Sequence, residues 1–121
     1  MELIERLNIL MESRQITEVV YDKLLKMIKI YPKECGIALT EENAAMMVTH
    51  IAQAIMRVEK GEKINEPDSL IIEQIKNDLQ FIRMSQIYDK TCLLLDVHFP
   101  AEEKWFVLVH MGNLIHFDNK V

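Results

Sequence analysis

Hydrophobic residues recur at intervals of three and four along most of the chain, the pattern of amphipathic α-helices. The repeat is interrupted near the three prolines and near Gly36 and Gly61. It predicts a first helix over residues 2–12 and a second over 15–31, which Pro32 and Gly36 end. Thr40 is the expected N-cap of a third helix with an acidic first turn, and Gly61 follows its end.

The second half of the chain continues the helical pattern. Pro67 is placed to start a fourth helix, and the apolar positions expected on its buried face are Leu70, Ile71, Ile75 and Leu79. Further helices are predicted over about 84–97 and 100–115, and the last is apolar nearly all round, as in a helix at the centre of a bundle. The apolar run 92–99 would be a strand without a partner, so we treat it as helical. The expected fold is an all-α bundle of five to six helices.

Composition narrows the classes of function. The 121 residues, half of them hydrophobic, predict a single domain over 1–121. A net charge of −5 argues against direct binding to nucleic acid, which needs clustered Lys and Arg. Two isolated cysteines fit a reduced compartment, and no signal core or run of about 20 apolar residues is present. We therefore expect a cytoplasmic protein with no membrane partner.

Two histidines carry the candidate chemistry. His50 and His110 each lie within an apolar helical stretch, and an imidazole can hold a proton, a metal or a phosphoryl group near neutral pH. On its helix, His50 shares a partly apolar face with Met47, Ala54 and Arg57, which suits the wall of a groove or a subunit contact. Glu103 and Phe106 share a face of the last helix with His110.

Other interpretations of the same histidines remain open. Either ring can be a core residue satisfied by one hydrogen bond, and His98 and His116, near helix ends, are read as structural or incidental. No metal-ligand spacing occurs, so a metal site needs the fold to bring residues together, and we assign neither metal nor cofactor. No nucleophile motif or phosphate-binding loop occurs either, so we do not expect an enzyme.

The two histidine stretches resemble the motifs of a known family, the phosphotransferase-system regulation domain (PRD). Residues 48–61 are similar to its first motif, in which a histidine precedes an apolar turn, Ile-x-Arg and a Lys-Gly-like ending. Residues 100–110 are similar to the second, with a proline and acidic start, then Glu103 and Phe106 seven and four positions before the histidine. The resemblance is strongest over residues 15–116. Asn65-Glu66-Pro67 departs from the usual Asn-Pro by one inserted residue, and Lys104-Trp105 departs from small or apolar residues.

The resemblance implies an all-α domain that forms homodimers and regulates transcription or antitermination. His50 and His110 match the two phosphoacceptor positions, and Arg57, Glu103 and Phe106 match supporting positions. The implied partners are the phosphocarrier protein or sugar-specific components of the phosphotransferase system. The chain has no room for the RNA- or DNA-binding domain usually attached, so we expect a free-standing copy. The alternatives are a non-phosphorylated helical interaction or dimerisation module, and an accessory protein that binds a small ligand or metal.

Overall fold

The computed structural model describes residues 1–119, and within that range the chain forms six helices and no strand. The predicted all-α class is therefore confirmed. The helices are α1 (Leu3–Glu12), α2 (Glu18–Cys35), α3 (Glu41–Glu59), α4 (Ser69–Lys76), α5 (Phe81–Leu95) and α6 (Ala101–Asn119).

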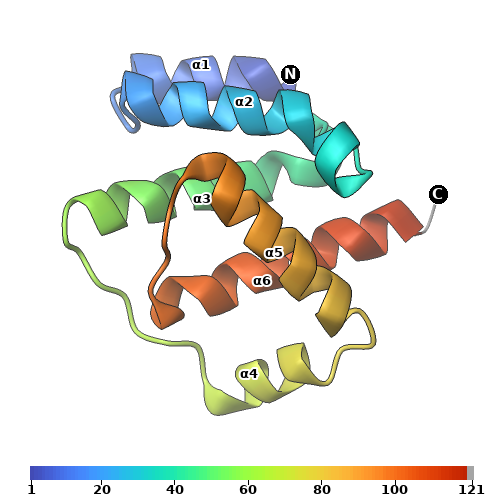
Figure 1. Cartoon of the computed structure of the whole chain (residues 1–121). Coiled ribbons are helices and arrows are strands. Elements are labelled where there is room, and N and C mark those ends of the chain that lie inside the picture. Colours follow the sequence, from blue (N-terminus) through green and yellow to red (C-terminus); the bar gives the residue numbers. More distant parts are fainter. Residues whose placement is uncertain (120–121) are drawn as a thin grey trace.

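The helices pack around one hydrophobic core. In Figure 1, α1 and α2 run side by side above α3, while α5 crosses α6 and α4 lies at the opposite end from α1. The main helix contacts join α3 with α6, α2 with α5 and α5 with α6. The central position of α6 explains why its sequence is apolar on nearly every side. No helix in residues 1–119 is long and apolar enough to cross a membrane.

Capping residues position α3, which carries the first candidate histidine. The Thr40 hydroxyl accepts a hydrogen bond from the Asn43 N–H, and the Asn43 side-chain oxygen accepts one from the Thr40 N–H. This capping box satisfies two N–H groups that lack partners within the helix. At the other end, Gly61 has a φ of 71°, the left-handed conformation that glycine adopts without steric cost. Both predicted ends of α3 are confirmed.

The predicted end of the second helix was wrong. Helix α2 continues through Pro32 to Cys35 and ends at Gly36, which has a φ of 74°. Proline removes one backbone hydrogen bond and crowds the carbonyl four residues earlier, and Pro32 lies on the exposed side of the helix in its last turn. Its neighbour Tyr31 is fully buried, and the Tyr31 hydroxyl is 2.9 Å from the Thr91 hydroxyl of α5. This packing between α2 and α5 keeps the residues around Pro32 helical.

The predicted buried face of the fourth helix was largely wrong as well. Helix α4 begins at Ser69, and the Asp68 side chain accepts a hydrogen bond from the Leu70 N–H, so Pro67 precedes the helix. Of the four residues expected to be buried only Ile75 is, and Leu79, which follows the helix, is 99% exposed. Because this two-turn helix packs chiefly against α6, it has only a narrow buried side.

Candidate functional site

The fold brings His50 of α3 and His110 of α6 into direct contact. Their ring centroids lie 4.4 Å apart and the ring planes differ by 25°, so the two imidazoles are stacked. Both residues are half-buried. Two residues separated by 60 positions in the sequence therefore form one stacked pair, to which α3 and α6 each contribute one ring.

An ion pair joins the same two helices beside the stacked rings. Arg57 donates from Nε to one carboxylate oxygen of Glu103 at 2.8 Å and from an Nη to the other at 2.9 Å. Glu103 is only 2% exposed, whereas Arg57 keeps access to solvent. The paired geometry gives both carboxylate oxygens of the buried Glu103 a charge-assisted hydrogen bond, and the bond to Glu103 raises the pKa of Arg57 above its ordinary value.

The spacing of these four residues explains how both contacts form together. Arg57 follows His50 by two helical turns, and Glu103 precedes His110 by the same interval. When two helices pack antiparallel, residues in this order lie opposite one another. His50 therefore contacts His110, and two turns further along α3 Arg57 contacts Glu103. From the sequence we expect His50 with Arg57 and Glu103 with His110 on shared helix faces, and the two histidines in one site. The pairing of Arg57 with Glu103 was not predicted.

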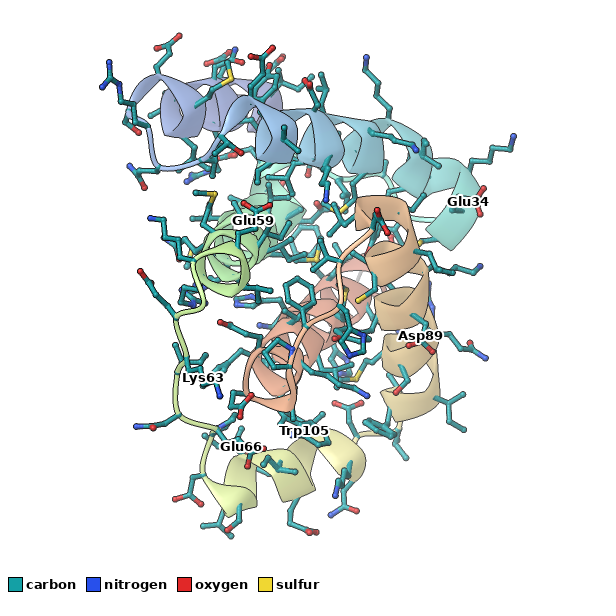
Figure 2. The ribbon with its side chains drawn as sticks, turned by 60° about the vertical axis from the view of Figure 1, so that its left-hand side comes forward. Glu34, Glu59, Lys63, Glu66, Asp89 and Trp105 are labelled. Carbon is teal, nitrogen blue, oxygen red and sulfur yellow. The ribbon has the colours of Figure 1, made fainter. Side chains whose placement is uncertain are left out.

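The rings and the ion pair line one pocket of about 270 Å³ between α3 and α6. Its lining residues are His50, Gln53, Ala54, Arg57, Ile64, Glu103, Phe106, Val107 and His110. Phe106 is 40% exposed, and Ile64 comes from the connection after α3 that also carries Lys63 and Glu66 (Figure 2). Ile64 was not among the residues predicted for the site, and the signal that could have identified it is a single isoleucine in an otherwise polar connection.

A second depression continues from the other side of His110 along the same interface. It is lined by Glu42, Asn43, Ala45, Met46, Met47, His110, Asn113 and Phe117. Met46 is well exposed, and so are parts of Phe117. His110 therefore borders both depressions and has solvent on more than one side. The core interpretation, in which the rings are sealed in the interior, does not describe this geometry.

The protonation of His110 suits a nucleophile. Burial, and then the neighbouring His50, lower the pKa of His110 from 6.5 to about 4. At neutral pH its ring is therefore uncharged, with one nitrogen lone pair free. A neutral imidazole can attack an electrophilic phosphorus or bind a metal, whereas an imidazolium can do neither.

The stacked arrangement fits a shared metal ion poorly. Imidazole lone pairs lie in the ring plane, so two rings stacked only 25° from parallel keep their lone pairs in two nearly parallel planes, one above the other. Ligation by both rings needs lone pairs that converge on one ion at about 2.0–2.1 Å. No group of three or more His, Cys, Asp or Glu in residues 1–119 is arranged to hold a metal.

The remaining histidines lie outside this pocket. His116 Nε2 is 3.1 Å from a carboxylate oxygen of Asp78, which connects the far end of α6 to the segment after α4. His98 is exposed and lines a separate depression of about 630 Å³ near the C-terminal end of α5. Neither histidine contacts the stacked pair.

A family model built from known proteins covers both histidine helices. The family model described as the PRD domain matches residues 25–114, which include α3 and most of α6. The chain is also 25% identical over 104 residues to YhfY, an uncharacterized protein of Escherichia coli (strain K12), covering 84% of this chain and 86% of that protein. A search of the solved structures found no significant match. With three quarters of its length matched by the family model, this chain belongs to the PRD family of phosphotransferase-system regulation domains.

Proposed function

We propose that this chain is a regulatory module that receives a phosphoryl group on His50 or His110 and changes its interactions in response. The donor is the phosphocarrier protein or a sugar-specific component of the phosphotransferase system. The observation that carries the proposal is the stacked histidine pair, which lines a solvent-accessible pocket next to the Arg57–Glu103 ion pair.

Phosphoryl transfer between histidines requires little catalytic machinery in the acceptor. The free ring nitrogen attacks the phosphorus of a donor phosphohistidine, so the acceptor must be neutral and reachable. His110 meets the first requirement through its lowered pKa and the second through the two depressions beside it. The partly exposed Phe106 offers the donor an apolar contact near the rings.

The transfer provides a physical basis for regulation. A phosphoryl group adds about −1.5 to −2 charges at neutral pH together with strong acceptor oxygens. Placed beside Glu103, this charge competes for Arg57, and the competition alters how α3 and α6 are joined. We propose that the two packing arrangements differ in affinity for a second copy of the chain and for an effector of transcription or antitermination.

Incubation with the donor system tests the proposal. The purified chain, phosphoenolpyruvate, the first enzyme of the system and the phosphocarrier protein are combined, and the intact mass is recorded before and after brief acid treatment. We expect the wild-type chain to gain an acid-labile phosphoryl group. Sedimentation velocity of the same samples measures the change in dimerisation.

Matched variants locate the modification. His50→Asn/His110→Asn removes both proposed acceptors, and His98→Asn/His116→Asn removes the two histidines outside the pocket. We expect the first variant to gain no mass and the second to behave as wild type. A wild-type chain that stays unmodified, with sugar-specific components also supplied as donors, contradicts the proposal.

A further inference from the structure

We infer that His50 and His110 form a single acceptor unit, in which either ring can take a phosphoryl group but the folded domain holds only one at a time. The inference rests on the proposed function and specifies how the site behaves when modified. It follows from the 4.4 Å separation of the ring centroids and from the charges that surround them.

The rings are too close to carry two dianionic groups in this setting. Among the described residues that line the adjoining depressions, the charged side chains are Arg57 of α3, Glu103 of α6 and Glu42 at the start of α3. Arg57 is the one cation among them. Its Nε and one Nη already donate hydrogen bonds to Glu103. A first phosphoryl group can compete for Arg57, and a second has no cation left.

Coulomb repulsion sets the size of the effect. Each phosphoryl group carries about −1.5 to −2 charges, and both groups would be attached to half-buried rings whose centroids lie 4.4 Å apart. Even with substantial screening by solvent, this repulsion disfavours the second addition on the order of a thousandfold. Separation of the rings would relieve it, but the buried core that α3 and α6 share opposes their separation.

The stacked geometry also argues against passage of the group from one ring to the other. In transfer, the N–P bond of the donor breaks as a new N–P bond forms to the acceptor. The attacking and leaving nitrogens lie roughly in line with phosphorus, and each ring keeps its other N–H proton. Because nitrogen lone pairs lie in the ring planes, two stacked rings cannot both point at one phosphorus atom. The histidines are therefore alternative acceptors rather than a relay.

This arrangement makes the modification binary. A domain with two independent acceptors would show three levels of added charge, whereas this unit has only an unmodified and a singly modified state. Loss of either histidine leaves one acceptor, so the total capacity of the folded domain stays at one.

Chemical phosphorylation with phosphoramidate tests this stoichiometry without a protein donor. The chain used is the His98→Asn/His116→Asn variant, in which His50 and His110 are the only histidines left. We expect the intact mass to reach a plateau at one added phosphoryl group in the folded chain and at two in urea, where the rings are apart. Circular dichroism verifies that the variant is folded.

Single variants in the same background complete the test. His50→Asn and His110→Asn should each accept one phosphoryl group in the folded state. A folded two-histidine chain that reaches two groups overturns the inference, and so does a single variant that accepts none. Because the reagent is a small molecule, these outcomes are independent of whether the phosphocarrier system recognises the chain, which tests the proposed function separately.

Discussion

Helix α6 meets α3 on one side and α4 on another, and polar side chains join it to each neighbour in very different surroundings. On the α3 side, Glu103 is 2% exposed and binds Arg57 through both carboxylate oxygens. On the α4 side, the His116 side chain is 50% exposed where it meets Asp78, and the Lys76 ammonium lies 5.5 Å from the Trp105 ring centroid. Figure 2 shows Trp105 between α6 and α4.

The difference in burial determines what each contact contributes. A buried carboxylate without its partner is costly because it has lost its hydration, so the α3 side depends on correct pairing. An exposed pair competes with water and salt and contributes little. The α3 side therefore fixes the geometry of the histidine pocket, while the α4 side is held mainly by the small buried area around Ile75.

The largest effect is expected from Arg57→Ala, which leaves Glu103 buried without a partner. We expect the free energy of unfolding to fall by about 3 kcal/mol, the lower end for a broken buried pair because Arg57 is partly exposed. Urea denaturation followed by circular dichroism measures the loss.

A double variant is the control for this prediction. Arg57→Met/Glu103→Leu replaces the pair by apolar side chains of similar size and should recover most of the stability. If Arg57→Ala has no measurable effect, the α3 side does not depend on pairing and the comparison fails.

Acidification should affect the α3 side through His110. Because its pKa is lowered to about 4 in the folded state, the unfolded chain binds the proton first as the pH falls below about 6.5. The stability contributed by neutral His110 is therefore complete above that value and is lost between about pH 6.5 and 4, by at most about 3 kcal/mol.

Unfolding free energies measured across this pH range for the wild type and His110→Gln give the contribution. The variant should lose less stability on acidification, and the exposed His98→Gln is the matched control, expected to follow the wild type. Parallel curves for wild type and His110→Gln would mean that His110 is not held neutral by the fold.

On the α4 side, Ile75→Ala is expected to lower the free energy of unfolding by about 2 kcal/mol, because Ile75 is the one buried side chain of that helix. Leu79→Ala should change it by less than about 0.5 kcal/mol, since Leu79 is almost fully exposed. Thermal or urea denaturation of the two variants measures the difference in their stability. Equal losses would show that α4 buries a broader face in solution.

The smallest effect is expected from Asp78→Asn. The Gln80 backbone N–H, and then His116, lower the pKa of Asp78, so its contribution is present above about pH 4 and is lost as the pH falls further. Because the pair is exposed, we expect a loss below about 1 kcal/mol at neutral pH and low salt. A loss as large as that of Arg57→Ala would remove the distinction between the two sides of α6.

The success of sequence reasoning followed the same division. The apolar stripe of α3, its cap at Thr40 and its end at Gly61 depend on neighbours within one helix, and all were predictable. The end of α2 and the exposure of Leu70 and Leu79 depend on which helices pack nearby, so local patterns misplaced them.

For the candidate site, the residue types that share each helix face follow from the sequence alone, because the helical repeat places positions seven apart two turns along the same side. The sequence also supplied the matching order of His50 and Arg57 on one helix, and Glu103 and His110 on the other. The antiparallel packing of these helices, in a register that stacks the imidazoles and buries the carboxylate, is visible only in the folded chain. That register arises from the whole core, since side-chain packing among distant helices selects one alignment from several that each helix alone would allow.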